Sequence, residues 1–319
     1  MKITYSVVMV TYYHEKYIRK AIDSVVSQTV FNEVEILIGD DGSKDNTVSI
    51  LNEYANKYPQ IHVFVHENVG LSKNVYSLLK KAKGQYIAIL EGDDFWIDPE
   101  KLEKQKEIIE KNGCIATACN SLIITDEGVK ISLWNELIPE GILSKKQILH
   151  YQTTVCHPSG VMLKNIFTGS GEKYDVIEKA SRMGGNHTGM INLLGSIGPF
   201  YLDTIPRTVW RIIQKTGAKN YSSQKLVDPI NYLESLRKYE MYEDCFNLGY
   251  ERHIYEEYCA LNLSIKKEIY SKIGKRRFYI GKVKYFLYRC VNFFENIVVR
   301  INRKKRRIKN DFNCQEESQ

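Results

Sequence analysis

Three carboxylates lie close together at the end of an apolar run in the first third of the chain. The run at 86–90 has the composition of a buried strand, and Glu91, Asp93 and Asp94 follow it directly. Carboxylates this close repel one another unless a cation lies among them, and an open set of oxygen ligands suits Mg²⁺ or Mn²⁺. Such a metal commonly holds the phosphates of a substrate. The pattern therefore indicates a site for a metal and a diphosphate, with a solvated acidic turn before Pro99 as the alternative.

The elements around this run alternate between strand and helix patterns. Apolar, β-branched runs predict strands at 3–10, 34–39, 62–66, 86–90 and 115–124. Helical spacing of apolar residues predicts helices at 15–28 and 71–83, a helix with Asp45 as its N-cap, and another that starts at Pro99. Such alternation predicts an α/β fold with a mainly parallel central sheet and helices on both faces. The polar strand ends at Thr11, Asp40–Asp41 and Glu91–Asp94 would then meet at one edge, where open α/β sheets bind ligands.

Two common ways of binding phosphate are missing from this sequence. A dinucleotide-binding dehydrogenase needs a GxGxxG turn after its first strand, but residues 11–16 contain no glycine, and no Walker pattern is present. A phosphate at this edge must therefore be held by a metal or by basic side chains.

Composition narrows the class of protein further. A chain of 319 residues with 43% hydrophobic content is typical of a globular protein with one large or two modest domains. The seven cysteines contain no CxxC pair, which favours reduced cytoplasmic thiols over a disulfide framework or a zinc site. We also expect neither a signal peptide nor a membrane-spanning helix.

Four sequence motifs occur in order along the first third of the chain: SVVMVTYYHE at 6–15, SVVSQ at 24–28, GDDGSKDNT at 39–47 and EGDDFW at 91–96. Together they resemble the family 2 inverting glycosyltransferases of GT-A fold, of the kind that builds bacterial cell-surface polysaccharides. The resemblance covers about residues 3–125 and extends more loosely to about residue 217, through a His-Pro-Ser-Gly sequence at 157–160 and apolar runs at 200–206 and 209–213. It implies a GT-A domain at 1–225, with a nucleotide-sugar half at about 1–125 and an acceptor half at about 126–225. A helical C-terminal region would follow at 226–319.

The resemblance also implies an activity and a set of binding residues. The activity is transfer of a hexosyl or N-acetylhexosaminyl group from a nucleotide-diphospho-sugar to a glycan or lipid-linked acceptor. Asp41 would accept a hydrogen bond from the uracil N3–H of a UDP-sugar, and Asp93, with Asp94, would hold Mn²⁺ or Mg²⁺. The residues expected to bind the nucleotide-sugar are Thr11, Tyr13, Glu15, Asp40, Asp41, Lys73, Glu91, Gly92, Asp93 and Arg211.

The general base is the point where this sequence departs from the family pattern. Inversion requires a base that deprotonates the acceptor hydroxyl, and a Gly-Asp dipeptide before a helix supplies it in the family. The matching residue here is Asn186, which cannot accept a proton at neutral pH. Three interpretations stay open: the base is Asp175, Glu172 or Glu178; it is His187; or the chain is a catalytically weak module that binds the donor.

The end of the chain is strongly basic. The segment from Lys266 to Lys309 contains sixteen Lys or Arg residues and two acidic residues. Within it, Phe286, Phe294 and Ile301 recur at helical spacing before the basic run at 303–307. This pattern favours an interfacial helix on anionic lipid, which would place the protein peripherally on the inner face of the cell membrane. Nucleic-acid binding is the alternative, but it is not expected because no binding motif accompanies the charge. The remaining interpretations of this segment are a solvated tail and a contact surface in a homo-oligomer.

Overall fold

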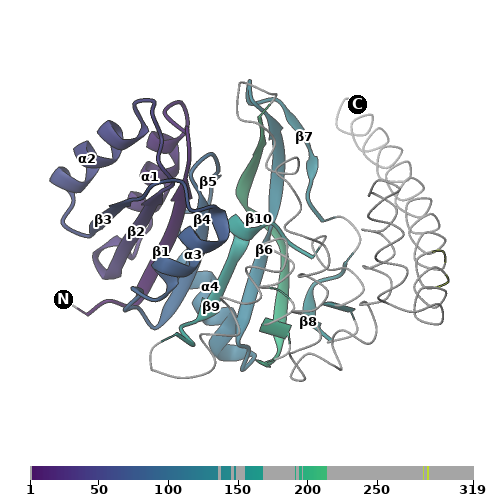
Figure 1. The fold of residues 1–319 in the computed structure, drawn as a ribbon. Helices are drawn as coiled ribbons and strands as arrows, with labels where there is room; N and C mark the ends of the chain where they lie inside the picture. Colours follow the sequence, from purple (N-terminus) through teal and green to yellow (C-terminus); the bar gives the residue numbers. More distant parts are fainter. Residues whose placement is uncertain are drawn as a thin grey trace, which may run out of the picture. The chain divides into compact units, whose positions relative to one another are not determined.

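The computed structural model describes residues 2–135, 138–144, 147–148, 155–167, 191, 194–195, 197–213, 283 and 286. The described strands form a ten-stranded sheet in the order β3-β2-β1-β4-β9-β6-β10-β5, with β7 paired to β6 and β8 paired to β10 (Figure 1). The strands are β1 (Tyr5–Thr11), β2 (Val34–Asp40), β3 (Ile61–Val65), β4 (Tyr86–Glu91), β5 (Phe95–Trp96), β6 (Ala116–Thr125), β7 (Lys130–Leu133), β8 (Gly141–Leu143), β9 (Val161–Lys164) and β10 (Phe200–Ile212). The helices are α1 (Ile18–Val26), α2 (Thr47–Lys57), α3 (Leu71–Leu79) and α4 (Lys101–Lys111), with short 3-10 turns η1 (Phe31–Glu33) and η3 (Pro158–Gly160).

The first four strands pair in parallel, as the alternating sequence pattern predicted. β1 lies between β2 and β4, and β3 pairs with the outer side of β2. Every residue of β1 and of β2 is buried. Strands buried on both faces read as continuous apolar runs, which is why the sequence located them well.

Helices cover both faces of this parallel part. Apolar residues of α1, α2 and α4 share one core with alternate residues of the strands, such as Val7 and Met9 of β1. α3 packs against β1 and β2 on the opposite face, since the side chain of Asn74 lies against Gly39 and donates to its carbonyl at 2.9 Å. A β-carbon at Gly39 would lie 1.9 Å from Asn74 Oδ1, so this close helix–sheet approach requires glycine.

The second part of the sheet is mixed, which refines the prediction of a mainly parallel sheet. β9 runs antiparallel between β4 and β6, whereas β10 runs parallel to β6 and antiparallel to β5 and β8. The two apolar runs predicted at 200–206 and 209–213 form the single strand β10. Its register with β6 shifts on both sides of Pro206, because proline cannot donate to a regular ladder.

Three helix boundaries differ from the predicted ones for reasons visible in the hydrogen bonding. α1 begins at Ile18 rather than at residue 15, after a turn in which the carbonyl of His14 accepts two backbone N–H groups. α3 ends at Leu79 rather than at residue 83, because the N–H of Lys83 donates to Glu35 instead of to the preceding turn. The N-cap of α2 is Asn46, while the expected cap Asp45 accepts the N–H of Thr47 at 3.1 Å.

Several predicted features fall on residues that the structure does not describe. These are the candidate bases between 172 and 187, the boundary at 225/226, and all of the C-terminal region except Val283 and Phe286. In the part of the chain that is described, no helix is long and apolar enough to cross a membrane.

Candidate active site

The carboxyl ends of three neighbouring strands bring the predicted polar residues together. Thr11 at the end of β1 is paired with Asp40 at the end of β2, and Val10 is paired with Glu91 at the end of β4. The sequence prediction that these strand ends share one edge is therefore confirmed. The loops that follow β1, β2 and β4 therefore lie at the edge where open α/β sheets bind ligands, and those after β2 and β4 are acidic.

The two aspartates after β2 shape the loops on either side of them. Asp40 accepts hydrogen bonds from the N–H groups of Gly42 and Ser43 and from the Ser43 hydroxyl. Asp41 accepts the N–H of Val69 at 2.8 Å with one oxygen and the N–H of Gly70 at 3.0 Å with the other. A carboxylate oxygen has two lone pairs, so Asp41 keeps acceptor capacity for a ligand N–H.

The loop after β4 turns tightly against β1. Gly92 donates its N–H to Val10 O at 2.8 Å, and the N–H of Asp94 closes a turn onto Glu91 O. A β-carbon at Gly92 would lie 2.8 Å from His14 Nδ1 and 2.9 Å from Thr11 Cβ, so a side chain there would displace the β1 loop. The glycine between the acidic residues is required by this close approach.

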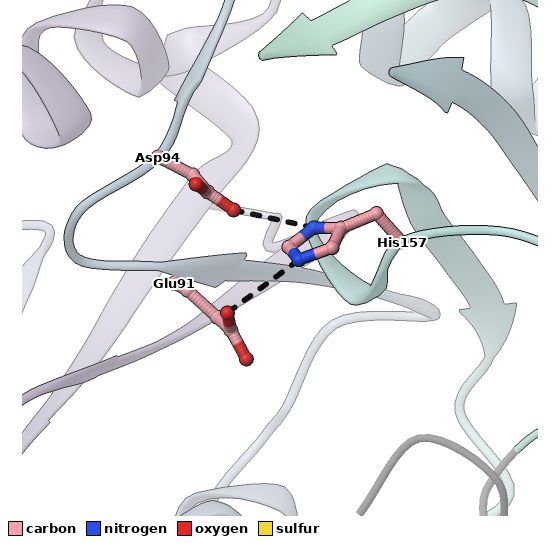
Figure 2. A group of neighbouring side chains, drawn as sticks. All are labelled: Glu91, Asp94 and His157. Atoms are coloured by element: carbon pink, nitrogen blue, oxygen red, sulfur yellow. Dashed lines mark ion pairs between the residues drawn. The ribbon is translucent and has the colours of Figure 1, made fainter. Parts of the chain in front are cut away.

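Asp94 is directed inward and is almost fully buried. One of its oxygens accepts the backbone N–H of Arg211 at 3.0 Å, and the other accepts the hydroxyl of Ser159 in η3. The Nδ1 atom of His157 lies 3.2 Å from that second oxygen, and its Nε2 atom lies 3.7 Å from a carboxylate oxygen of Glu91. Figure 2 shows the imidazole between the two carboxylates, one at each ring nitrogen.

This arrangement concentrates negative charge in a buried place. Burial and the neighbouring Asp93 raise the pKa of Glu91 to about 8. Burial, followed by the charges of Asp93 and Glu91, also raises the pKa of Asp94 well above its usual range. A cation among these groups would offset the repulsion, and Glu91, Asp94 and His157 each offer one ligand atom within 4.8 Å of the others.

Asp93 points elsewhere, toward the end of β1. Its carboxylate is 20% exposed and lies 3.9 Å from His14 Nε2, whose side chain is 18% exposed. Asp93 and Asp94, predicted to share a metal, therefore face different neighbours. Asp93 is the more open of the two, because the side chain of Asp94 is 0% exposed.

Arg211 ties β10 to the acidic loop. Besides the backbone bond to Asp94, its Nε donates to Asp93 O at 3.3 Å and its Nη1 donates to Asp126 O at 3.0 Å. The guanidinium also lies over the rings of Tyr17 and Phe95. These contacts bring a fixed positive charge beside the predicted diphosphate position.

The remaining predicted donor-binding residues lie around the same edge. Tyr13 is exposed and adopts a left-handed backbone with φ of 58°, and the Glu15 carboxylate accepts from the N–H and side chain of Asn46. Lys73 is exposed on α3. The hydroxyl of Thr11 is buried and has no hydrogen-bond partner among the described residues.

The candidate bases lie outside the described residues: Asn186, His187, Asp175, Glu172 and Glu178. Three residues at the site were not predicted to take part in it. These are His14, which faces Asp93, and His157 and Ser159, which hold Asp94. The first lies within a motif and the other two in the His-Pro-Ser-Gly sequence, but no local pattern indicates that residue 157 meets residue 94.

Comparisons with known proteins identify the family and the fold to which this chain is similar. The family model described as Glycosyl transferase family 2 matches residues 6–167, just over half of the chain. A Haemophilus influenzae protein described as an uncharacterized glycosyltransferase is 32% identical over 131 residues, which cover 40% of this chain and 51% of that protein. The putative teichuronic acid biosynthesis glycosyltransferase TuaG of Bacillus subtilis is 32% identical over 127 residues, which cover 40% of this chain and 50% of that protein. The chain thus spans about half the length of these two relatives. An uncharacterized Mycobacterium tuberculosis protein is 37% identical over 130 residues, which cover 40% of this chain and 38% of that protein.

The structure resembles that of Staphylococcus aureus TarS 1-349 in complex with UDP-GlcNAc. The TM-score is 0.57 at 18% identity, and the match covers 88% of this chain and 74% of that one. At this identity the likeness shows the fold, and it confirms the GT-A fold implied by the sequence motifs. On the family match and the shared fold, this chain belongs to glycosyl transferase family 2.

Proposed function

We propose that the chain transfers a hexosyl or N-acetylhexosaminyl group, with inversion, from a UDP-linked sugar to a hydroxyl of a glycan or lipid-linked acceptor. The observation that carries this proposal is the convergence of Asp40, Asp41, Glu91 and Asp93 at the ends of β2 and β4 beside the end of β1. This is the edge at which open α/β sheets bind nucleotides. The UDP-GlcNAc in the complex of TarS, a protein of the same fold, supports the choice of donor.

The part of the site after β2 is suited to the nucleoside. Asp41 is fixed by two backbone N–H groups and keeps lone pairs for an N–H donor, which supports a hydrogen bond from uracil N3–H. Thr11 and Tyr13 on the neighbouring loop, with Glu15 and Lys73 at its margins, complete the proposed nucleotide pocket. The neutral hydroxyl of Thr11 already lacks a partner among the described residues, so it can donate to a ligand without losing a bond.

The part after β4 is suited to a metal-bound diphosphate. We assign Asp93 as the carboxylate that holds Mn²⁺ or Mg²⁺, because a metal that binds substrate phosphates needs open coordination positions. Asp93 is partly exposed, whereas the side chain of Asp94 is 0% exposed and is already held by the Arg211 N–H and the Ser159 hydroxyl. When bound, the metal would act as a Lewis acid on the departing nucleoside diphosphate. Arg211 would add a fixed positive charge beside the same oxygens.

The acceptor half supplies the remaining chemistry. Inversion requires a base on the side of the sugar opposite the diphosphate, and we place it between residues 172 and 187, with Asn186 at the position expected for the base. The putative role of TuaG in teichuronic acid biosynthesis supports a cell-envelope polysaccharide as the product. The basic C-terminal segment would bring the protein to an anionic membrane surface, and the exposure of Val283 and Phe286, both in helical conformation, supports that role.

A thermal-unfolding screen tests the donor assignment. UDP-glucose, UDP-galactose, UDP-GlcNAc and GDP-mannose are each added to the full chain with Mn²⁺ or with a chelator. A ligand present at about 100 times its Kd stabilises the native state by about 2.7 kcal/mol. For a domain of this size that raises the midpoint by roughly 5–11 °C. We expect such a shift with a UDP-sugar and Mn²⁺, and little or none with UMP, which lacks the diphosphate. If no nucleotide-sugar shifts the midpoint in the presence of metal, the proposed donor site is wrong.

A further inference from the structure

His14 is a histidine at the acidic edge, and neither of its ring nitrogens has a hydrogen bond among the residues that the structure describes. Its Nδ1 atom is buried and finds no partner among the described residues. Its Nε2 atom lies 3.9 Å from Asp93 Oδ2, which is too long for a hydrogen bond. An imidazole this close to the open carboxylate of the site, with neither nitrogen satisfied by the described residues, is poised for a ligand.

The backbone holds His14 in this position from several sides. Tyr13 adopts a left-handed conformation that non-glycine residues rarely adopt, and its N–H is bonded to Ser43 Oγ at 2.8 Å. The N–H of His14 donates to Thr47 Oγ1 at 2.9 Å. The absence of a side chain at Gly92 leaves room for the ring, since a β-carbon there would lie 2.8 Å from Nδ1. The loop is thus built to direct this imidazole toward Asp93.

The separation between Nε2 and Oδ2 suits a shared metal ion. With metal–ligand bonds of about 2.1 Å, neighbouring octahedral ligands lie about 3.0 Å apart and opposite ones about 4.2 Å apart. The observed 3.9 Å lies between these limits, so a small side-chain rotation completes either arrangement. Both groups are partly exposed, so water and phosphate oxygens can fill the other positions.

The group of Glu91, Asp94 and His157, buried except for a Glu91 side chain that is 21% exposed, is a poorer match for that metal. Asp94 and His157 are 1% and 3% exposed, and the Ser159 hydroxyl and the Arg211 N–H already bond to Asp94. A diphosphate could reach such a metal only by displacing these internal bonds. We therefore propose that His14 and Asp93 together bind the divalent metal that holds the donor diphosphate, with His14 as a nitrogen ligand. This inference rests on the proposed function and adds a ligand to its metal site.

Electron paramagnetic resonance of Mn²⁺ tests the assignment directly. The full chain, labelled with ¹⁵N-histidine, is mixed with Mn²⁺ and UDP, and the hyperfine coupling of a metal-bound imidazole nitrogen is measured by pulsed methods. Four proteins are compared: the parent, His14→Asp, His157→Gln, and the control His62→Gln, which alters an exposed histidine on β3. We expect the nitrogen coupling in the parent, His62→Gln and His157→Gln proteins and its loss in His14→Asp. His14→Asp keeps an oxygen ligand, so it should still bind Mn²⁺ and UDP together.

Affinity provides a second measurement that does not depend on the spectrum. His14→Gln should weaken Mn²⁺-dependent UDP binding at least about tenfold, the lower end of the effect seen when even outer-shell groups around metals are removed. It should weaken the Mg²⁺-dependent binding less, because imidazole is a poor ligand for Mg²⁺. An unchanged unfolding midpoint without metal shows that the variant is folded.

Three results would overturn the assignment. A Mn²⁺–UDP complex without histidine coupling in the parent would remove His14 as a ligand and leave the proposed function standing. Loss of the coupling in His157→Gln instead would move the metal to the buried group. Failure of the parent to bind UDP with Mn²⁺ at all would overturn both the inference and the proposed function.

Discussion

Removal of the Ser159 hydroxyl should destabilise the chain by loosening the buried end of the acidic loop. Ser159 is fully buried, its hydroxyl donates to Asp94 Oδ2, and it accepts the N–H of Glu91 at 3.2 Å. Removing one partner of a buried hydrogen bond and leaving the other unsatisfied costs about 1–3 kcal/mol of stability. Ser159→Ala should therefore lower the thermal midpoint by roughly 2–12 °C, at about 2–4 °C per kcal/mol for a domain of this size.

The assay is thermal unfolding of the full chain without metal, with Ser77→Ala as the matched control. Ser77 donates only to the neutral carbonyl of Asn74 within α3, so its loss should change the free energy of unfolding by no more than about 0.5 kcal/mol. A double-mutant cycle of Ser159→Ala with Asp94→Asn then isolates the pair. We expect a coupling energy of about 0.5–3 kcal/mol, as for residues in one hydrogen-bond network. A coupling near zero, or equal effects of the two serine changes, would refute this account of the loop.

Three further predictions concern the charge at the site, the base and the tail. Burial and Asp93 raise the pKa of Glu91 to about 8. As far as this carboxyl is concerned, the metal-free protein should be most stable below about pH 4.5 and should lose stability as the pH rises toward 8. Glu91→Gln should flatten this pH dependence in melts at several pH values, and an unchanged slope would contradict the explanation. If Asn186 has replaced the base, Asn186→Asp should raise turnover by about 10²–10⁴-fold with little change in donor affinity, whereas a drop in the rate of an active parent would place the base elsewhere. The full chain should sediment with anionic vesicles at low salt and be released as salt rises, since each Lys or Arg near the surface contributes about 1 kcal/mol. Changing the five basic residues at 303–307 to Gln should abolish sedimentation, whereas changing five exposed lysines elsewhere to Gln, as the control, should not. Equal effects of the two sets of changes would rule out the basic C-terminal segment as the membrane-binding element. The control lysines are Lys2, Lys57, Lys83, Lys111 and Lys130.

The sequence located the parallel half of the fold because its strands are buried on both faces. β1, β2 and β4 are largely apolar, with Ser6 and Glu35 as interior exceptions, and each ends in the polar residues that build the site. The short strands β5 and β7, of two and four residues, carry too little periodicity to predict. β9 takes its place from the strands on either side, so its antiparallel position between β4 and β6 could not be derived locally.

The candidate site was predictable to the same extent. Strand-end position and residue type were enough to select Asp40, Asp41 and Asp93. The different surroundings of Asp93 and Asp94 could not be predicted, because they depend on contacts between segments that are distant in sequence. Asp94 is buried by Ser159 and by the backbone of Arg211, which are 65 and 117 residues away in sequence. Such pairings depend on the completed sheet.

Calorimetric titration of UDP into the full chain tests the central claim most directly. The account predicts binding that requires Mn²⁺ or Mg²⁺ in the parent and is weakened at least about tenfold in Asp93→Asn, since Asp93 is assigned as a direct metal ligand. Glu107→Gln, which removes an exposed carboxylate on α4, should bind as the parent does. Metal-dependent binding of equal affinity in the parent and in Asp93→Asn would contradict the assignment of the open carboxylate at the end of β4 as the metal–diphosphate site.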